Sequence, residues 1–307
     1  MKHQPDSPAR IDSFAASRGH IWAPDASRSA IAELQRAAKV RQPADEQAER
    51  RRFGDEQAHV LLVADPQQPG ARDVARRALD EAMDGALNAV PWNPELDVDA
   101  EARLRRRLKQ LFVDSNRALA PSAPASLTMA FVRWPMLFLV HAGNNRAFLV
   151  RDGETFQLTR DHTIAQQMVD AGRIDAPDEY GDELQERCWN GVGGRKPVEP
   201  ELCDRELQPG DSVVLCSPRL GRALDHETIG EVVRGAADAR SACDALLAHA
   251  SADRGTIAVA RLHEQQPQAA HVIDGPRADR GRDRKPRPRT AKAKAVAAVG
   301  RRRSANA

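Results

Sequence analysis

The chain has 307 residues, of which 41% are hydrophobic and 29% are charged, and its formal net charge is +2. This length supports one mid-sized domain with appendages. Its apolar runs are only a few residues long and residues 1–10 are polar, so the sequence predicts no membrane span and no signal peptide and favours a cytoplasmic protein.

The spacing of the cysteines and histidines predicts neither a metal site nor a set of disulfide bonds. The nine histidines form no HxxxH or HExxH pattern, which argues against an imidazole metal site. The four cysteines are well separated and form no CxxC pair, so we expect four reduced, mostly buried thiols: Cys188, Cys203, Cys216 and Cys243.

The charge is unevenly distributed along the chain. Residues 264–307 carry 12 Lys and Arg against 4 Asp and Glu, a net charge of +8, which leaves −6 for the residues before them. This segment is rich in Pro, Ala and Arg and has no apolar periodicity, so we expect a disordered basic tail. The tail is either a passive solvated segment or an arm for nonspecific nucleic-acid or acidic partners.

The first predicted elements precede an aspartate. Ile31, Leu34 and Ala38 share one helical stripe, so Ser29–Val40 is predicted as a short amphipathic helix. A charged stretch follows and repeats the tetrapeptide DEQA. His59–Ala64 (HVLLVA) then has the length and composition of a buried strand, and it ends at Asp65.

Helical periodicity returns in two segments, Asp73–Leu87 and Glu101–Leu119. A β segment begins at Ser126. In the second helix, the apolar residues fall on one face, which we expect to pack on the core: Leu104, Leu108, Leu111 and Phe112.

The next stretch reads as an antiparallel meander. Leu137–Val140 and Ala147–Val150 have the length of buried strands, and Gly143–Asn145 supplies residues that tolerate positive φ. Asp152-Gly153 is a strong hairpin signal, and a short third strand follows it.

The remaining elements complete an α+β pattern. A polar loop is expected at Asp175–Glu186 and a buried strand at Ser212–Cys216 (SVVLC). A last helix, Ala239–Ser251, leads into a closing strand, Thr256–Leu262. Strands and helices in this order predict a layered α+β domain.

Several of these segments resemble motifs of the protein phosphatase 2C family of metal-dependent serine/threonine phosphatases. The RDG turn at Arg151–Gly153 and the LTRDH run at Leu158–His162 stand almost unchanged, whereas the family's GDSR reads GNNR at Gly143–Arg146. The family's "vvADGmGG" resembles VADPQQPG at Val63–Gly70, and its "pGDlllLCSDGL" resembles PGDSVVLCSPRL at Pro209–Leu220.

The resemblance continues in order from about Arg41 to Leu262. The family's "GtTa", "ltraLGg" and "DNiTvvvv" resemble the chain at Ser126–Met129, Asn190–Gly194 and Asp253–Ala260. It implies a sandwich of two antiparallel β-sheets flanked by α-helices. It also implies a site of two Mn or Mg ions, held by carboxylates, that activate a water to attack a phosphate.

When the family's metal ligands are transferred onto this sequence, the resemblance implies that some are retained and others are replaced. The resemblance retains two metal-binding aspartates, Asp65 and Asp253. Pro218 replaces the aspartate of the family's SDG motif and offers no side-chain ligand, and Asn144 replaces the aspartate of GDSR. Pro66 keeps a carbonyl where the family has a glycine, but its φ is fixed. Arg254 brings a cation next to Asp253.

The family's first motif, "R..NEDa", matches the chain in more than one register. In the preferred placement Arg41 orients the phosphate and Glu46 is a remaining metal ligand, within the repeat Asp45–Ala48. Arg52 with Asp55–Ala58 has the family spacing but leaves little chain for a hairpin. A third placement, around Gly19–Ala26, lacks the arginine.

Plain structural roles stand beside these assignments. Taken alone, Asp65 and Asp253 are compatible with ordinary loop residues, and Arg41 or Arg52 with a solvated charged face. Arg146 is expected to be structural because its family counterpart lies beside the strand pair, and His162 is expected to pack or cap within its turn.

These observations lead to two main hypotheses. The first is a pseudophosphatase, in which residues 41–263 keep the fold and bind a protein or phosphoprotein partner in signalling, after an N-terminal extension over residues 1–40. The alternative is a weak, divergent Mn- or Mg-dependent serine/threonine phosphatase, in which Asp211 or Asp225 substitutes for a lost ligand. A minor third hypothesis is a nucleic-acid-associated protein that acts through residues 277–303.

Overall fold

The fold is taken from a computed structural model of the chain. The chain divides into two units, residues 1–266 and 267–307, and all described residues lie in the first. They are residues 10–18, 28–35, 57–68, 71, 73–89, 98–119, 123–175, 181–250 and 255–263. The predicted basic tail therefore lies outside them. No helix in these ranges is long and apolar enough to cross a membrane.

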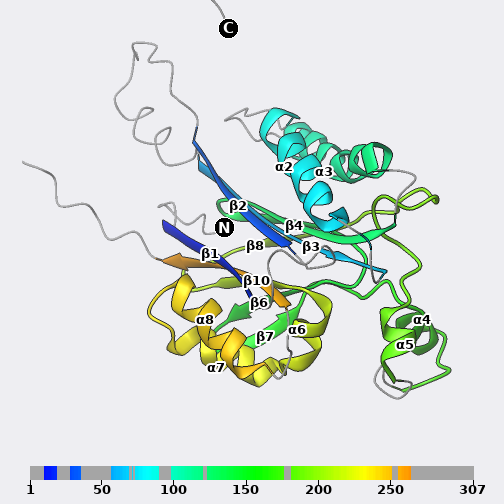
Figure 1. Cartoon of the computed structure of the whole chain (residues 1–307). Helices are drawn as coiled ribbons and strands as arrows, with labels where there is room; N and C mark the ends of the chain where they lie inside the picture. Colours follow the sequence, from blue (N-terminus) through cyan, green and yellow to red (C-terminus); the bar gives the residue numbers. More distant parts are fainter. Residues whose placement is uncertain are drawn as a thin grey trace, which may run out of the picture. The chain divides into compact units, whose positions relative to one another are not determined.

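Two five-stranded antiparallel sheets form the centre of this unit (Figure 1). The first sheet has the order β1 (Arg10–Arg18), β10 (Gly255–His263), β9 (Ser212–Cys216), β6 (Arg146–Arg151) and β7 (Glu154–Gln157). The second has the order β2 (Arg28–Gln35), β3 (Gln57–Pro66), β4 (Ala125–Arg133), β5 (Met136–Ala142) and β8 (Glu201–Glu206). The predicted fold, a sandwich of two antiparallel sheets flanked by helices, is confirmed.

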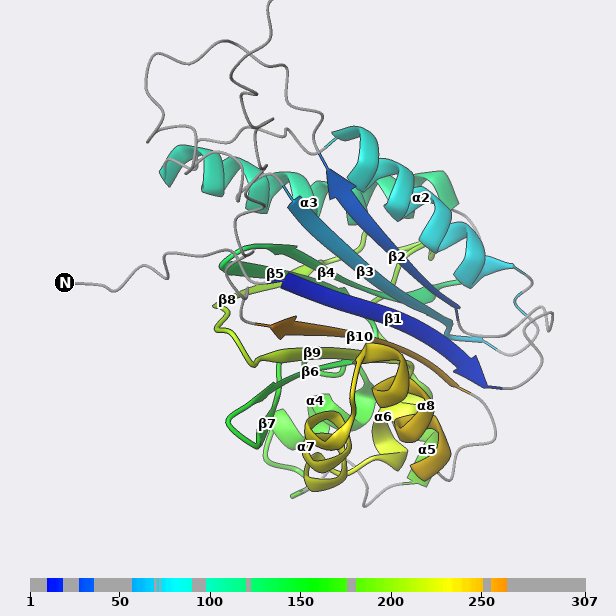
Figure 2. The ribbon, with the colours of Figure 1, turned by 90° about the vertical axis from the view of Figure 1, so that its left-hand side faces the viewer.

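Helices cover the outer face of each sheet, as Figure 2 shows. α2 (Val74–Ala89) and α3 (Val98–Leu119) lie on the second sheet, and α3 buries the face predicted for it, including Leu108 and Phe112. α7 (His226–Gly235) and α8 (Ala239–His249) lie on the first sheet. The described residues also contain three short helices: α4 (Ile164–Asp170), α5 (Gly181–Glu186) and α6 (Pro218–Ala223).

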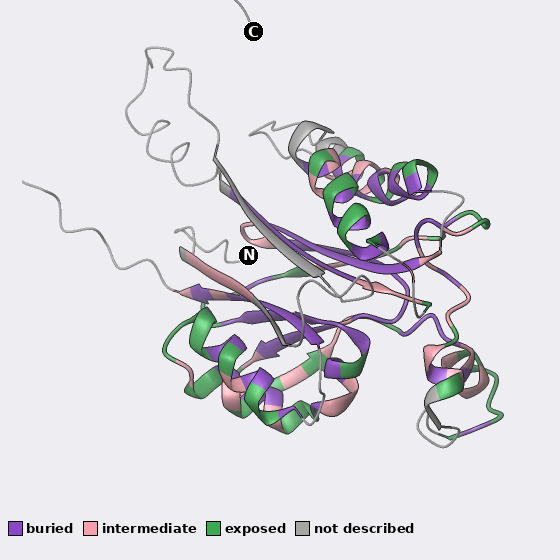
Figure 3. Ribbon diagram, viewed as in Figure 1, coloured by how far each residue is buried: buried purple, intermediate pink, exposed green. Residues whose placement is uncertain are grey.

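The central strands are buried on both faces (Figure 3). Along β3, Leu61 and Val63 pack against the other sheet, whereas Val60, Leu62 and Ala64 pack under α2 and α3. Alternating side chains on a strand point to opposite faces, so a strand covered on both sides requires an unbroken apolar run. The run HVLLVA is therefore explained by helices on one side and a sheet on the other.

The predicted meander is wrong at its first corner. β5 and β6 belong to different sheets, and Gly143–Asn145 carries the chain from one sheet to the other. The apolar pattern of the two strands is the same for a hairpin and for a crossing between packed sheets, so it does not distinguish them. The second turn is confirmed, because β6 and β7 pair through Asp152 and Gly153, both at positive φ.

Three further predictions require correction. Residues 28–35 form a strand rather than the start of a helix over Ser29–Val40, because β2 pairs with β3 along its whole length. Ala, Glu and Gln favour helices in isolation, but pairing in a sheet overrides that preference. Within the predicted N-terminal extension over residues 1–40, the described strands β1 and β2 are members of the two sheets and so belong to the domain. The polar loop at Asp175–Glu186 ends in the helix α5.

A buried ion pair closes one end of the first sheet. The guanidinium of Arg151, at the end of β6, donates from Nε to Asp211 Oδ1 at 2.8 Å and from Nη2 to Oδ2 at 2.6 Å. The backbone N–H of Gln208 donates to the same carboxylate at 2.7 Å. Asp211 is 2% exposed, and its hydrogen bonds raise the pKa of Arg151. The RDG turn at Arg151–Gly153 thus anchors the loop before β9.

We predict that Asp211→Ala lowers the free energy of unfolding by about 3 kcal/mol, because it leaves a part-buried guanidinium without its partner. Asp114→Ala, which removes an exposed ion pair with Arg117, serves as the control and costs less than about 1 kcal/mol. Urea denaturation followed by circular dichroism measures both values. Equal effects of the two substitutions would contradict the structural role of Asp211.

Candidate functional site

The ends of several strands from both sheets come together near Asp65. Asp65 lies at the end of β3, is half-buried, and stands opposite Ser126 on β4. The crossing at Gly143–Asn145 follows β5 at the same end, because Ala142 pairs with Leu127. Cys216 at the end of β9 pairs with Arg146 at the start of β6, so the first sheet ends here too. Asp65, Asn144 and the start of α6, where Pro218 stands, therefore lie at one end of the sandwich.

The hydroxyl of Ser126 is the centre of a buried network, here called the Ser126–Asn144 network. Ser126 Oγ donates to Asn144 Oδ1 at 2.7 Å and accepts from the Asn144 backbone N–H at 3.1 Å. Gln67 Nε2 donates to the same hydroxyl at 3.1 Å and to the carbonyl of Asn190 at 2.8 Å.

The amide of Asn144 extends this network to α5. Its Nδ2 donates to the carbonyl of Gln185 at 3.3 Å. A carboxylate has no N–H and would place an oxygen against that carbonyl. The replacement of the family's aspartate thus removes a negative charge and also adds a hydrogen-bond donor that the structure uses.

His162 has a packing role, as expected from its turn. It is 1% exposed, and its Nδ1 accepts from the backbone N–H of Gly143 at 3.1 Å and lies 2.9 Å from Asn190 Nδ2. Its ring lies 4.8 Å from the rings of His141 and of Trp189. Burial lowers the pKa of His162, although nearby Glu201 opposes the shift.

Arg146 also has the structural role expected of it. Its Nε and Nη2 donate to the carboxylate of Asp161 at 3.0 to 3.3 Å, and its Nη1 donates to the carbonyl of Gly221 at 3.2 Å. Asp161 is 8% exposed. The guanidinium therefore ties the start of β6 to the LTRDH turn and to α6.

The thiol of Cys188 is another group at this end of the sandwich. Burial, with the negative charge of Asp161 as the next cause, raises the pKa of Cys188 to about 12. A hydrogen bond with Ser126 and the charge of Arg222 lower the pKa of Cys188, whereas the charge of Asp65 raises it. A protonated thiol is a poor nucleophile and a poor metal ligand. All four cysteines are free, but only Cys216 and Cys243 are buried.

Pro218 takes part in helix geometry. It is buried at the first turn of α6, directly after Ser217, and proline suits this position because no helical N–H is required there. Ser217 Oγ accepts from the backbone N–H of Thr256 at 3.0 Å and so joins α6 to the start of β10. Pro218, which stands at the position of the family's SDG aspartate, therefore stabilises the start of α6 and offers no side-chain ligand.

Neither carboxylate proposed as a substitute ligand is suited to that role. Asp211 lies at the opposite end of β9 and is engaged by Arg151. Asp225 is the exposed N-cap of α7, and its Oδ1 accepts from the Thr228 backbone N–H at 2.7 Å. The prediction that one of them replaces a lost ligand is wrong, because both carboxylates already stabilise local structure.

The other predicted site residues, Arg41, Glu46, Asp253 and Arg254, lie outside the described residues. Strand pairing nevertheless shows which end of β2 lies near Asp65, and this bears on the alternative placements of the first motif. Gln35 pairs with Gln57 and Arg28 pairs with Ala64, so β2 begins at the end of the strand pair near Asp65 and ends at the far end. Eight residues of strand separate Gln57 from Asp65, which is about 26 Å.

Within the described ranges, no group of three or more His, Cys, Asp or Glu side chains is arranged to hold a metal ion. Sequence reasoning missed Gln67, Glu186 and Arg222 at this end of the sandwich. Gln67 carried a signal, because a polar side chain stands where the resembling motif "vvADGmGG" has its apolar m, two residues after the aspartate. Glu186 and Arg222 had none, since they come together only through the packing of α5 and α6.

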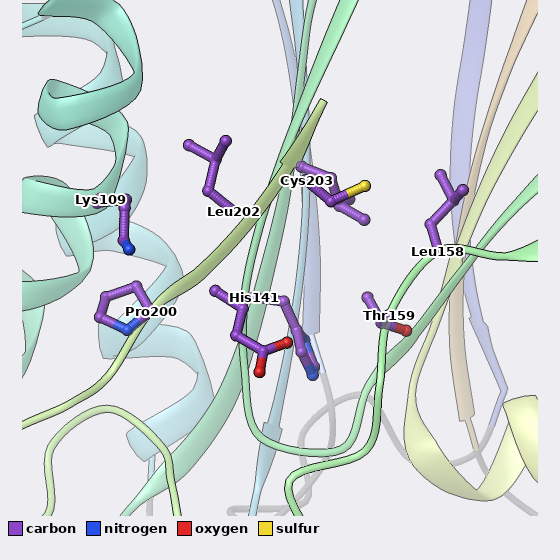
Figure 4. A pocket seen from close by; sticks show the side chains of 9 residues that line it. Lys109, His141, Leu158, Thr159, Pro200, Leu202 and Cys203 are labelled. Atoms are coloured by element: carbon purple, nitrogen blue, oxygen red, sulfur yellow. The ribbon is translucent and has the colours of Figure 1, made fainter. Parts of the chain in front are cut away.

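A pocket of about 310 Å³ lies beside this end, between the β5–β8 edge and the segment after β7 (Figure 4). His141, Glu201 and Cys203 line it from the second sheet, and Leu158 and Thr159 line it from the opposite side. His141 is 2% exposed, and its Nδ1 lies 2.8 Å from Thr128 Oγ1. Burial, with His162 as the next cause, lowers the pKa of His141 to about 3.

The comparisons with known proteins agree with this geometry. No family model matches the chain. The serine/threonine protein phosphatase PstP of Mycobacterium tuberculosis is 29% identical over 224 residues, which cover 70% of this chain and 39% of that protein. The chain thus spans about two fifths of the length of this relative.

Solved structures give the same result. The crystal structure of mycobacterial PstP matches 82% of this chain and 99% of its own, with a TM-score of 0.58 and 25% identity. A second structure, the PstP catalytic domain with two manganese ions, has a TM-score of 0.56 and 23% identity, and the match covers 83% of this chain and all of that one. The homologues of this chain are protein phosphatase 2C-type serine/threonine phosphatases, and the chain has their fold.

We predict that Asn144→Asp, which restores the family's aspartate, lowers the free energy of unfolding by about 1 to 3 kcal/mol at pH 7. Asn144 is 4% exposed, so the new carboxylate would be buried against the Gln185 carbonyl without its former N–H donor. Chemical denaturation with and without Mn²⁺ measures the effect. An unchanged or higher stability in the absence of metal would show that the amide donor is dispensable.

We also predict a pH dependence of stability from His141. Because the pKa of His141 is lowered to about 3 in the folded protein, the unfolded chain takes up a proton at this side chain at a higher pH than the folded chain does. The contribution of neutral His141 to the free energy of unfolding is therefore fully present above about pH 6.5 and is lost as the pH falls toward 3. The slope is about 1.4 kcal/mol per pH unit in this window. Denaturation of the wild type and of His141→Gln from pH 7 to 4 checks it, and equal slopes would refute the assignment.

Proposed function

We propose that this protein is a pseudophosphatase, which uses a protein phosphatase 2C fold to bind a protein or phosphoprotein partner without hydrolysing it. The observation that carries the proposal is the state of Asn144. Its amide is buried and hydrogen bonded to Ser126 and Gln185 at the position of a family carboxylate. A network whose members are satisfied by one another does not need a metal ion for its stability.

The chemistry of the donors supports this proposal. Two divalent ions close together require several hard oxygen ligands with negative charge. Asp65 is available by type and Pro66 offers a carbonyl, but Pro218 offers no side-chain oxygen and Asp161 is engaged by Arg146. The described residues therefore do not fit a binuclear centre, and we derive no catalytic step through metal ions.

The second candidate is a divergent Mn- or Mg-dependent serine/threonine phosphatase with weak activity. Asp65 at the end of β3 favours it, as does the similarity to PstP, whose catalytic domain binds two manganese ions. It requires Asp253 and one acidic residue from the first motif as further ligands. The register of β2 and β3 favours the placement of that motif around Gly19–Ala26 over Glu46, because Arg28, at the start of β2, pairs beside Asp65, whereas Gln35, at its end, pairs with Gln57.

Partner binding has two sources of support. The first is the surface formed by the strand ends near Asp65, where a partner can bind. The second is the basic composition of residues 264–307, which provides long-range attraction to anionic partners. A nucleic-acid role through this tail would show a steep salt dependence confined to it.

A phosphatase assay with excess Mn²⁺ distinguishes the two candidates. We expect the wild type to release phosphate from a phosphopeptide and from an aryl phosphate no faster than Asp65→Ala. Mycobacterial PstP in the same buffer is the positive control. Activity that disappears with Asp65→Ala would establish a working metal site and refute the pseudophosphatase proposal.

A further inference from the structure

Two arginines of α6 share one carboxylate of α5. Arg219 Nη2 lies 3.0 Å from Glu186 Oε1, and Arg222 Nη2 lies 3.8 Å from the same oxygen. The side chains of Arg219 and Glu186 are 48% and 42% exposed, whereas that of Arg222 is 13% exposed. The group therefore has an accessible outer part and a buried inner guanidinium.

The charges in this group are not balanced. Two guanidinium ions face one carboxylate, and the Nη1 atom of Arg222 is buried without a hydrogen-bond partner among the described residues. Leaving a charged donor buried and unsatisfied costs free energy. By contrast, the neighbouring guanidinium of Arg146 is fully engaged by Asp161 and Gly221. The Nη1 group of Arg222 can therefore still donate a hydrogen bond.

The group lies at the Asp65 end of the sandwich. Arg222 and Asp65 both act electrostatically on the thiol of Cys188, only two residues beyond Glu186. Arg222 also lies four residues after Pro218 on α6, a spacing that places both on the same side of a helix. A fixed cation therefore stands near the position where the family's SDG motif supplies a metal-binding carboxylate.

We propose that Arg219 and Arg222 form a metal-independent binding site for a phosphate monoester and that Glu186 occupies this site as an internal carboxylate. The inference rests on the proposed function and names the residues by which a phosphorylated partner would be recognised. Arginine binds phosphate through two parallel N–H donors, and a phosphate dianion balances two guanidinium charges, which a single carboxylate does not.

Replacing Glu186 by the ligand also has a structural consequence. Glu186 is the last residue of α5, and its ion pairs hold that end of the helix against α6. A phosphate that takes over the arginines removes this contact, while the Asn144 side chain still donates to the carbonyl of Gln185. Binding would therefore alter how α5 is attached beside the site.

The test is a titration in EDTA with two probes, inorganic phosphate and a phosphoserine peptide, measured by calorimetry on the full chain. We expect Arg222→Gln and Arg219→Gln each to weaken binding at least about tenfold, because each loses charge-assisted hydrogen bonds. Glu186→Gln removes the internal competitor and should tighten binding about two- to fivefold. Arg76→Gln, which alters an exposed ion pair on α2, is the matched control and should bind as the wild type does.

Thermal melting confirms that each variant is folded before it is titrated. Binding that Arg222→Gln leaves unchanged, or that Glu186→Gln weakens, overturns the inference, and so does a wild type that binds neither probe. Binding of the peptide alone identifies a phosphorylated protein as the ligand, and equal binding of both probes identifies the phosphate group itself. The Mn²⁺ assay described above is independent: hydrolysis there refutes the proposed function even if Arg222 proves to bind phosphate.

Discussion

The close approach of Gly143 to Ser126 is the constraint on which the site depends. Here the chain leaves the second sheet and enters the first, and Gly143 has a φ of 117°. A Cβ atom on this residue would lie 2.2 Å from Ser126 Oγ, so only glycine allows the approach. The crossing brings Asn144 onto the Ser126 hydroxyl and aligns the strand ends of both sheets around Asp65. Every later feature of the site follows from this contact.

At this point the structure replaces charge by hydrogen bonds. In a metal site, carboxylates gathered at the strand ends repel one another and need divalent ions to balance them. In this chain an amide, a hydroxyl and a glutamine meet there, and each has partners within the protein. Such a network is neutral and stable without an ion. In the pseudophosphatase proposal, the loss of metal ligands and the gain of internal hydrogen bonds are therefore two aspects of the same substitutions.

The sequence predicted those parts of the fold that local patterns determine. The buried runs of β3 and β9, the apolar face of α3 and the hairpin at Asp152-Gly153 depend on short-range periodicity or turn chemistry, and all were found. The strand β2 and the crossing after β5 were missed because both depend on which distant strand supplies the pairing partner. Local sequence carries no direct information about that choice.

The site was predictable to a similar degree. The resemblance located Asp65, Asn144 and Pro218, since each stands within an ordered motif. It did not reveal that the amide of Asn144 donates to α5, nor that Arg222 lies near Asp65, because those contacts join segments from separate parts of the chain. Substitutions in a motif show which chemistry is lost, whereas the contacts that replace it appear only in the folded structure.

Both candidate functions require a positive charge near Asp65. In the phosphatase this charge belongs to divalent metal ions, and in the pseudophosphatase it belongs to an arginine. A divalent ion is exchangeable, so a site that depends on one responds to chelators and can activate water. A guanidinium is covalently fixed and cannot activate water, but it presents oriented donors to an oxyanion. Arg222 is a carrier of the second kind, because it is largely buried and its Nη1 has no hydrogen-bond partner in the described part of the chain. Under the pseudophosphatase proposal, a phosphatase fold that exchanges a mobile cation for a fixed one would keep the ability to recognise phosphate and would lose the means to hydrolyse it.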